Sequence, residues 1–262
     1  DFGRLREVLS LATPGLVYAH DEVRFARAIS AAVSRDAEVL CGDIPEAEPT
    51  AQVDEAHAAT GPDTIAKFLF TSGSTGQPKA VINTQRMLCA NQQMLAQSLP
   101  YLAEVPPVLV DWLPWHHTAG GNHNIGIALY NGGTLYIDEG RPMPGLVDKT
   151  VRNLREVGPT IYFNVPKGFE ALLPFLRDDA ELRRNFFSRL KVLFYAGASL
   201  QQYVWDELQA MSVATCGERV IFVSSIGSTE TAPMALACNW DFPRPGNIGL
   251  PAPDVELKLV PN

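Results

Sequence analysis

Short apolar runs that favour strands alternate with stretches of helical spacing along this 262-residue chain. Runs rich in β-branched and aromatic residues predict strands at 16–18, 66–70, 108–112, 134–137, 160–163, 191–195, 220–223 and 255–260. Apolar residues spaced by three or four predict helices at 5–11, 23–33, 87–99, 147–154, 169–176 and 200–211. This alternation is typical of sheets covered by helices, so we predict an α/β fold of layered sheets with flanking helices.

Three local signals refine this outline. Pro166 suits the first turn of a helix, because proline has no N–H to leave unpaired there. Asn83 or Thr84 can cap a helix that follows the glycine-rich stretch near residue 75. The Ala/Glu/Pro-rich segment 44–59 predicts a surface connection.

The composition excludes several classes of protein. Hydrophobic residues make up 46% and charged residues 19%, which fits a folded globular chain and not a disordered one. The formal net charge of −8 leaves no basic face for nucleic acid or an anionic membrane. No apolar run reaches about 18 residues, so we predict no membrane span. The cysteines form no CxxC pair, which favours reduced thiols in the cytoplasm.

The two ends of the sequence shape a further expectation. The chain starts with Asp1-Phe2-Gly3-Arg4, which is neither an initiator methionine nor a signal-peptide pattern, and a predicted strand reaches almost to Asn262. We therefore expect the chain to be a piece of a longer protein.

A stretch rich in glycine and hydroxyl groups follows the predicted strand 66–70 and carries the strongest chemical signal. Its residues are Thr71, Ser72, Gly73, Ser74, Thr75, Gly76, Gln77, Pro78 and Lys79. Here backbone N–H groups and short hydroxyls can converge on a phosphate chain, and the lysine adds a cation. A flexible turn is the structural alternative. A Walker loop is excluded, because it needs Gly before the lysine and Ser or Thr after it.

Residues 71–79 resemble the signature loop of the acyl-adenylate-forming superfamily, which includes acyl-CoA synthetases, luciferases and the adenylation domains of peptide synthetases. Three further segments follow in that family's order. Leu-Pro-Trp-His-His at 113–117 resembles its Leu-Pro-x-x-His segment, Ala-Gly-Ala-Ser-Leu at 196–200 its Gly-Gly-Ala-x-Leu turn, and Ile-Gly-Ser-Thr-Glu at 226–230 its Tyr-Gly-x-Thr-Glu motif. The resemblance places residues 1–262 in the central part of the family's large N-terminal, AMP-binding domain.

Longer stretches resemble one branch of the superfamily, the feruloyl-CoA synthetases. These stretches are 110–123, 130–137 and 162–170. The substrates of that branch are hydroxycinnamic acids. Ligases for fatty acids or other aryl acids remain the nearest alternatives within the enzyme class.

The resemblance implies a two-step reaction. A carboxylate attacks the α-phosphorus of MgATP to give acyl-AMP and pyrophosphate, and coenzyme A then attacks the acyl carbon and releases AMP. The implied small molecules are therefore ATP, Mg²⁺, coenzyme A and a hydroxycinnamic acid such as ferulate. The resemblance leaves open whether the protein forms a homodimer.

The resemblance also assigns roles to individual residues. It implies that the loop 71–76 and Lys79 hold the β- and γ-phosphates, and that Thr229 and Glu230 contact the α-phosphate and Mg²⁺, respectively. The implied adenine wall is Gly197, Ala198 and Ser199, with Ile226 at the stacking position, and Gly227 is implied as a further nucleotide-binding residue. Lys79, Thr229 and His117 are the implied catalytic residues. The structural alternative for Glu230 is a solvated loop carboxylate. The structural alternative for Ser199 is the N-cap of a helix that starts at Leu200.

One departure from the family pattern concerns the nucleotide. Ile226 stands where the family has an aromatic ring that stacks on adenine, so we expect weaker nucleotide affinity or altered base preference. Ser199 replaces the usual Pro or Ala, which we expect to be harmless.

The acyl side of the predicted site rests on the segment after residue 112. His117 matches the family histidine near the substrate carboxylate, and Trp115, Gly121 and Asn122 are candidates for a flat slot that takes an aryl ring. His116 and His123 invite a metal site, but no cluster of Cys or carboxylates completes it, which favours pocket or core histidines.

Three other residues keep a structural alternative to a substrate role. Trp112 fits ordinary core packing, Asn164 fits a helix cap, and Lys167 fits a surface cation as well as a contact with a ring substituent.

The family pattern continues past residue 258 to a ribose-binding aspartate, a hinge and a small domain with the adenylation lysine. We therefore expect this chain alone to be inactive, and a non-catalytic nucleotide-binding module is the alternative from another class.

Overall fold

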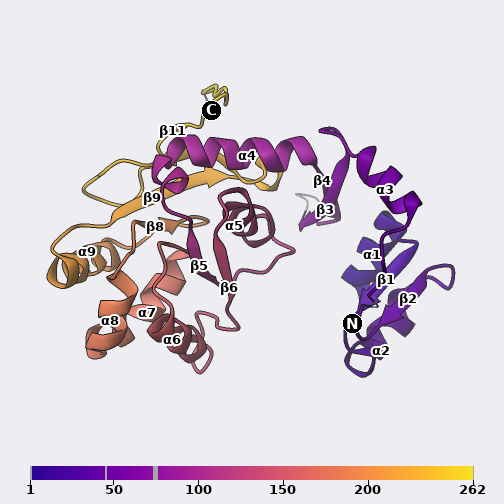
Figure 1. Cartoon of the computed structure of the whole chain (residues 1–262), viewed down its shortest axis with the longest axis horizontal. Coiled ribbons are helices and arrows are strands. Elements are labelled where there is room, and N and C mark those ends of the chain that lie inside the picture. Colours follow the sequence, from indigo (N-terminus) through magenta and orange to yellow (C-terminus); the bar gives the residue numbers. More distant parts are fainter. Residues whose placement is uncertain (1, 45, 73–75, 262) are drawn as a thin grey trace. The chain divides into compact units, whose positions relative to one another are not determined.

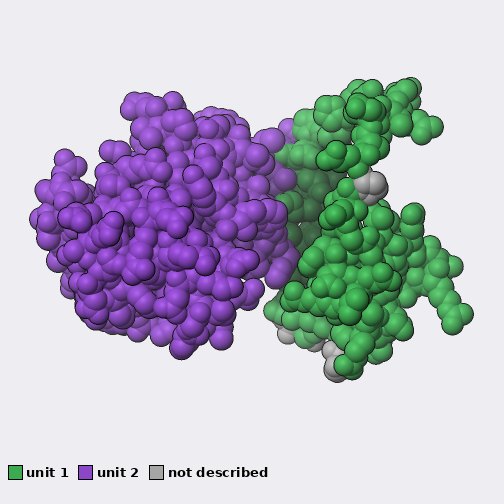
Figure 2. Space-filling view, turned by 60° about the horizontal axis from the view of Figure 1, so that its bottom comes forward, with its two compact units in different colours: residues 1–85 green, residues 86–262 purple. Residues whose placement is uncertain are grey.

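The structure, a computed structural model, describes residues 2–44, 46–72 and 76–261. The chain divides into two compact units, residues 1–85 and 86–262, which Figure 2 colours separately. Among the described residues, no helix is long and apolar enough to cross a membrane.

Unit 1 is built from short helices and two-stranded sheets. Its elements are α1 (Gly3–Ala12), β1 (Leu16–Ala19), α2 (Glu22–Ala32), β2 (Glu38–Cys41), α3 (Ala51–Ala58), β3 (Ile65–Ser72) and β4 (Pro78–Thr84). β1 and β2 pair in parallel, whereas β3 and β4 form an antiparallel hairpin. α3 lies within the segment 44–59 that the sequence predicts as a surface connection, and the described residues of that segment are all exposed.

Unit 2 alternates strands and helices over most of its length (Figure 1). Its elements are α4 (Gln85–Ser98), η1 (Pro100–Ala103), β5 (Val108–Asp111), η2 (Ala119–Asn124), α5 (Ile125–Tyr130), β6 (Thr134–Ile137), α6 (Val147–Glu156), β7 (Ile161–Asn164), α7 (Pro166–Asp178), α8 (Ala180–Phe187), β8 (Val192–Tyr195), α9 (Gln202–Cys216), β9 (Ile221–Gly227), η3 (Thr229–Thr231), β10 (Met234–Cys238) and β11 (Leu250–Pro251).

The central sheet of unit 2 has the strand order β11-β10-β9-β8-β7. β7, β8 and β9 are parallel to one another, and β10 and β11 are antiparallel to their neighbours. β5 and β6 form a separate parallel pair. β5 lies next to the start of β7, because the Thr160 N–H donates to the Val108 carbonyl at 3.0 Å.

The parallel strands of this sheet bury both of their faces. Tyr162, Leu193 and Phe222 face a core that they share with α6, α7, α8 and α9. Phe163 and Phe194, which alternate with them along the strands, face a second core shared with α4 and α5. Unit 2 is therefore a sheet between two helical layers, which confirms the predicted α/β fold.

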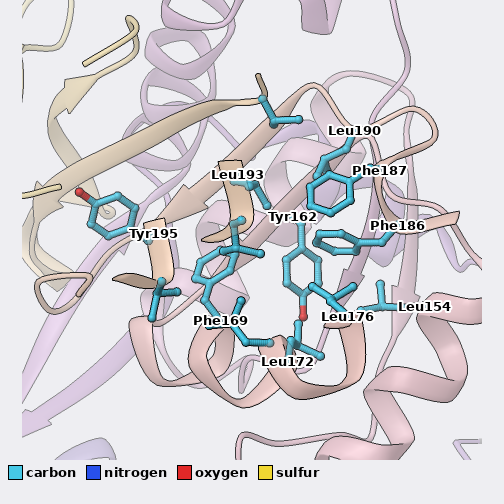
Figure 3. Packing of buried hydrophobic residues seen from close by; sticks show 14 of the residues in the cluster. Leu154, Tyr162, Phe169, Leu172, Leu176, Phe186, Phe187, Leu190, Leu193 and Tyr195 are labelled. Atoms are coloured by element: carbon cyan, nitrogen blue, oxygen red, sulfur yellow. The ribbon is translucent and has the colours of Figure 1, made fainter. Parts of the chain in front are cut away.

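Aromatic side chains fill much of the first core (Figure 3). The Tyr162 ring meets Phe169 edge to face at a centroid distance of 5.8 Å and Phe186 at 5.2 Å. Edge-to-face packing of this kind adds to the free energy gained from burial. The core thus joins β7 firmly to α7 and α8.

Most predicted elements of the parallel layer are confirmed within one to three residues at their ends. Pro166 is in the first turn of α7, as predicted. The last predicted strand, 255–260, is wrong: these residues have no strand structure, and most of them are exposed with no neighbouring strand among the described residues. Ser199 is not the cap of a helix from Leu200, because α9 begins at Gln202 and Gln201 is its N-cap.

The described residues on the two sides of the glycine-rich stretch pair with each other. They belong to two antiparallel strands, with Thr71 opposite Lys79 and Ser72 opposite Pro78. β4 then runs to Thr84, and only after it does α4 begin. Burial alternates along β4, with Val81 and Asn83 buried and Ile82 exposed, so the short β-branched run after Lys79 is a strand that the sequence analysis missed.

One buried side chain of α4 holds the turn between η3 and β10. The Asn91 amide donates to the Met234 carbonyl at 2.9 Å and to the Thr231 carbonyl at 3.1 Å. Its oxygen accepts the Met234 N–H at 3.4 Å. Asn91 therefore fixes the backbone that follows the motif 226–230.

We expect Asn91→Leu to lower the free energy of unfolding of unit 2 by about 2 kcal/mol, because the Met234 carbonyl loses its donor in a buried place and the Thr231 carbonyl loses one in a partly buried place. Denaturant unfolding measures this loss. The matched control is Gln97→Leu, an exposed position on the same helix, and equal losses for the two variants would contradict the assigned role.

Candidate functional site

The sequence motifs of unit 2 follow the carboxyl ends of neighbouring strands. The segment 113–117 follows β5, the turn 196–200 follows β8, and the motif 226–230 spans the end of β9 and η3. Parallel strands present their carboxyl ends at one edge of a sheet, which is where α/β sheets bind ligands. The structure therefore brings 196–200 and 226–230 to the same edge of the five-stranded sheet, whereas 113–117 follows β5, which pairs with β6 and lies next to β7.

The turn after β8 is open and lies next to the end of β9. Tyr195 pairs with Ser224, so the turn continues alongside Ser225 and Ile226. Gly197 has a φ of +84°, a left-handed conformation that favours glycine, and Ala198 and Ser199 are exposed. Small exposed residues at a strand end leave room for a flat group.

The motif 226–230 depends on its glycine. A side chain at Gly227 would overlap the Pro233 carbonyl oxygen. The Thr231 hydroxyl also ties this turn together, because it donates to the Pro233 carbonyl at 2.5 Å and accepts the Ser228 N–H at 2.8 Å.

Beyond this turn, the side chains of the motif differ in exposure. Ile226 is 46% exposed, Thr229 is half-buried and Glu230 is exposed on η3. The turn therefore presents a hydroxyl and a carboxylate close together in the chain at the edge of the sheet.

His117 lies exposed just before η2. Its Nδ1 accepts the Ala119 N–H at 3.2 Å, and its carbonyl accepts the Gly121 N–H at 2.8 Å. This backbone path is tight, since a side chain at Gly121 would overlap the Trp115 carbonyl and one at Gly120 would crowd Leu113. The two glycines thus let the loop 113–117 pack on η2.

The other predicted acyl-site residues differ in burial. Trp115 is 50% exposed, whereas Asn122 is 4% exposed and its amide donates to the Thr118 hydroxyl at 3.1 Å. Trp112 packs against the second core, which agrees with its structural alternative. Their contacts with a substrate stay a prediction.

The histidines of this segment do not gather. His116 is exposed and His123 is buried, and the described residues contain no group of three His, Cys, Asp or Glu that could hold a metal ion. The structure thus gives no support to a metal site built from these histidines.

The phosphate-loop prediction falls in unit 1. Thr71 and Ser72 end β3, Gly76 has a φ of +82°, and Lys79 lies exposed in β4. Gly73, Ser74 and Thr75 lie outside the described residues. The hairpin presents the flanks of the loop on two paired strands, so the lysine has a defined place beside Thr71.

Asn164 and Lys167, the two residues with open roles, have structural partners. The Asn164 oxygen accepts the Val165 N–H at 2.8 Å at the start of α7, and its amide donates to the Tyr162 hydroxyl at 3.1 Å. Lys167 forms an exposed ion pair with Glu170 at 2.7 Å.

A buried polar cluster that is not among the predicted site residues lies at the carboxyl ends of β5 and β6. The Asp138 carboxylate accepts hydrogen bonds from the Gly140 N–H at 2.8 Å, the Thr150 hydroxyl at 2.5 Å and the Asn153 amide at 2.9 Å. Asp111 accepts the Leu113 N–H at 3.1 Å and so fixes the start of the loop 113–117. The available signal is the position of Asp111 near the end of the predicted strand 108–112 and of Asp138 directly after the predicted strand 134–137.

Asp111 and His123, two buried ionisable groups of this region, have shifted pKa values. Burial raises the pKa of Asp111 from 3.8 to about 6. The Leu113 N–H and the Asn124 amide favour the charged form and oppose this rise, whereas the negative charge of Asp138 adds a little to it. Burial also lowers the pKa of His123 from 6.5 to about 4. At neutral pH the site therefore contains a buried carboxylate and a neutral imidazole.

Mg²⁺ is implied by the resemblance, and the donors of unit 2 fit it in one way. The ion prefers oxygen ligands and commonly takes only one or two carboxylates together with phosphate oxygens and water. The exposed carboxylate of Glu230 beside the Thr229 hydroxyl meets that requirement.

We expect Asp111→Asn to change how stability depends on pH. The unfolded chain loses the Asp111 proton at a lower pH than the folded chain, so this group lowers the free energy of unfolding as the pH rises from about 4 to 6. The free energy of unfolding of the variant should equal that of the wild type near pH 4. At pH 7 it should be higher than that of the wild type by up to about 3 kcal/mol.

Denaturant unfolding across this pH range, with the difference between variant and wild type as the readout, checks the prediction. Taking the difference removes the opposite effect of His123, whose lowered pKa makes stability fall as the pH falls below about 6.5. Asp148→Asn, at an exposed carboxylate of α6, is the control. A difference that does not vary with pH would contradict the burial of a charged Asp111.

Comparisons with known proteins agree with this arrangement. A long-chain-fatty-acid–CoA ligase of Escherichia coli O6:H1 is 29% identical over 76% of this chain and 34% of that ligase. A 3-hydroxybenzoate–CoA ligase of Aromatoleum sp. is 27% identical over 78% of this chain and 36% of that ligase. The chain thus spans about a third of the length of these curated relatives.

A solved structure resembles nearly the whole chain. It is a malonyl-CoA ligase in a ternary product complex with methylmalonyl-CoA and AMP, 27% identical, with a TM-score of 0.74 over 99% of this chain and 51% of that one. A model of the AMP-binding enzyme family matches residues 3–262. The chain therefore belongs to the AMP-binding enzyme family.

Proposed function

We propose that the full-length protein is an AMP-forming acid–thiol ligase that activates a hydroxycinnamic acid such as ferulate. The observation that carries the proposal is the order of the motifs and where their neighbouring strands end. Thr71 and Lys79, which flank the phosphate loop, lie on paired strands. The segments 196–200 and 226–230 follow the adjacent strands β8 and β9 of one sheet, and 113–117 follows β5, which lies next to β7. Membership of the AMP-binding enzyme family supports the same chemistry.

The chemistry explains why such a protein needs a nucleotide. A carboxylate has no good leaving group, so it cannot acylate a thiol directly. Attack of its oxygen on the α-phosphorus of ATP breaks the bond to the β-phosphate and releases pyrophosphate. The thiol sulfur of coenzyme A then attacks the acyl carbon, and the departing AMP carries away the electron pair of the acyl–oxygen bond.

The residues of unit 1 serve the phosphates in this proposal. Lys79 has its place on β4 directly opposite Thr71, so its charge and the flanking hydroxyl can act on the same phosphate. Catalysis of phosphate transfer consists largely of positioning and neutralisation of charge. In this role Lys79 stabilises the charge that develops on the leaving pyrophosphate.

The residues at the sheet edge of unit 2 serve the α-phosphate and the base. Thr229 donates to an α-phosphate oxygen, and Glu230 supplies one ligand to Mg²⁺, which neutralises phosphate charge when bound. The adenine lies against the turn 197–199, where exposed small residues allow a flat ring to approach.

The acyl group is assigned from the segment after β5. His117 is exposed at the loop that ends in η2, and Trp115 beside it is half exposed, so both can reach an acid bound at the sheet edge. One relative is named for a hydroxyaryl acid and another for long-chain fatty acids. The resemblance to feruloyl-CoA synthetases favours the aryl acid, with fatty-acid and other aryl-acid ligases as the alternatives.

The first test is ATP–pyrophosphate exchange by the full-length protein with Mg²⁺. We expect ferulate and coumarate to stimulate exchange more than benzoate or a medium-chain fatty acid. Lys79→Ala should slow the exchange by about 100-fold, as removal of a charge-stabilising donor does elsewhere. Lys149→Ala, at an exposed lysine paired with Glu139, is the control.

Each result of this assay is informative. If a fatty acid stimulates exchange most strongly, the proposed reaction is supported but the proposed aryl substrate is wrong. An absence of exchange with every acid would favour a non-catalytic nucleotide-binding module. Equal rates for the two lysine variants would remove Lys79 from the phosphate site.

The adenine contact gives a separate prediction. Ile226→Tyr places an aromatic ring at a position that is 46% exposed beside the turn 197–199, so we expect the KM for ATP to fall by up to about tenfold through stacking. Ile221→Tyr, at the 41% exposed first residue of β9, should leave it unchanged. An unchanged or higher KM in the first variant would argue against adenine at this position.

A further inference from the structure

His123 is a buried polar side chain that the proposed mechanism does not use. It lies in η2, is 1% exposed, and its ring packs against two aromatic rings. The centroid distances are 5.0 Å to Phe163 and 4.9 Å to Phe194. An imidazole in such an apolar place requires hydrogen-bond partners for both of its nitrogens.

Only one of the two nitrogens has such a partner. Nδ1 lies 2.8 Å from the side-chain oxygen of Asn124. Nε2 is enclosed and has no hydrogen-bond partner among the described residues. A buried polar atom left in this way costs free energy, so it calls for a functional explanation.

The neighbours of His123 define what Nε2 can bind. Burial keeps the imidazole neutral, since it lowers the pKa to about 4. A neutral ring has one N–H, and the Asn124 oxygen can only accept, so that hydrogen lies on Nδ1. Nε2 is therefore an acceptor, and its partner must bring a hydrogen.

The position of His123 in unit 2 points to the acyl group as the source of that hydrogen. Phe163, Phe194 and Val223 are aligned across β7, β8 and β9, and His123 packs on this row. Two residues further along the chain come Val165 and Ala196, which lie just past the ends of β7 and β8 and pack against the same core, and Ser225 within β9. All three are half-buried, and they lead to the turn 197–199 at the edge of the sheet.

We propose that His123 determines the specificity for a hydroxyl on the acyl group, with Nε2 accepting a hydrogen bond from the phenolic O–H of a hydroxyaryl acid. The inference rests on the proposed function, because it places the acid between the sheet edge and the Phe163–Phe194 row. The flat apolar rings suit the aryl ring, and the acceptor suits its hydroxyl. Since Nε2 is enclosed, binding requires the surrounding side chains to move and open a path to it.

The selectivity follows from the cost of an unpaired group. A site built to bond a hydroxyl discriminates against an analogue that lacks it, because the buried acceptor then stays without a partner. The enzyme should therefore prefer 4-hydroxycinnamate to cinnamate, which differs only by that hydroxyl. Removal of the acceptor should abolish the preference and leave the reaction itself in place.

The test compares kcat/KM for these two acids in pyrophosphate exchange by the full-length protein. We expect His123→Phe, which keeps a ring of similar shape, to lower the ratio of 4-hydroxycinnamate to cinnamate by about tenfold, as for loss of one hydrogen bond. The rate with cinnamate should change much less. His123→Gln, which restores an acceptor, should recover part of the ratio.

His116→Phe is the matched control, because His116 is an exposed histidine of the same segment. It should leave the ratio unchanged. A second readout needs neither activity nor a stable variant: ¹⁵N spectra of histidine-labelled wild-type protein, titrated with each acid. We expect 4-hydroxycinnamate to shift the Nε2 resonance of the buried neutral imidazole and cinnamate to leave it in place.

The outcomes separate this inference from the proposed function. If folded His123→Phe still catalyses exchange and its ratio of kcat/KM for the two acids is unchanged, the role of His123 is overturned and the proposed ligase reaction stands. A wild type without exchange whose Nε2 signal still responds to 4-hydroxycinnamate would support hydroxyl recognition and overturn the reaction. If His123→Phe does not fold, the wild-type spectra decide: an Nε2 resonance that shifts with neither acid would overturn the inference.

Discussion

The parallel strands of unit 2 bury both faces, and the arrangement of the candidate site depends on this constraint. A strand with helices on each side has no face left for polar chemistry, so its polar groups gather where it ends. Asp111 and Asn164 are the last residues of β5 and β7, and the motif turns begin just after β5 and β8 and at the end of β9. The two cores therefore do more than stabilise the sheet: they hold neighbouring strand ends in register, and that register brings distant motifs to one edge.

This edge carries groups that reduce stability as well as groups that add to it. Asp138 is fully bonded and joins the end of β6 to α6, so it acts as a structural anchor. Asp111 and His123 differ from it, because each is buried with a pKa shifted away from the charged form. A protein selected for stability alone would replace such groups by apolar ones of similar shape. Their presence beside the motif loops agrees with a site that uses them.

The sequence predicts the parallel layer well because its signals are local. Runs such as 192–195 are apolar on both faces and too short for a helix, and Pro166 marks the start of α7 within one residue. The predictions fail where tertiary pairing decides. Residues 255–260 have a strand-like composition but no neighbouring strand, and the stretch after Lys79 is a strand because it pairs with β3. The site follows the same rule. The motif residues were found by pattern, whereas Asp111, Asp138 and His123 acquire their properties only from burial by segments far away in the sequence.

This difference bears on how one fold can serve many acids. The nucleotide motifs are short, and each is shaped by its own turn, as the overlap at Gly227 and the left-handed Gly197 show. The proposed acyl contact is shaped by packing between η2 and the row Phe163–Phe194, which no motif contains. Substitutions in that row can change the shape and polarity offered to the acid while every nucleotide turn keeps its backbone. Relatives named for a fatty acid and for a hydroxybenzoate are consistent with this separation. The choice of acid therefore depends on long-range contacts such as that of His123, whereas the reaction depends on the motifs.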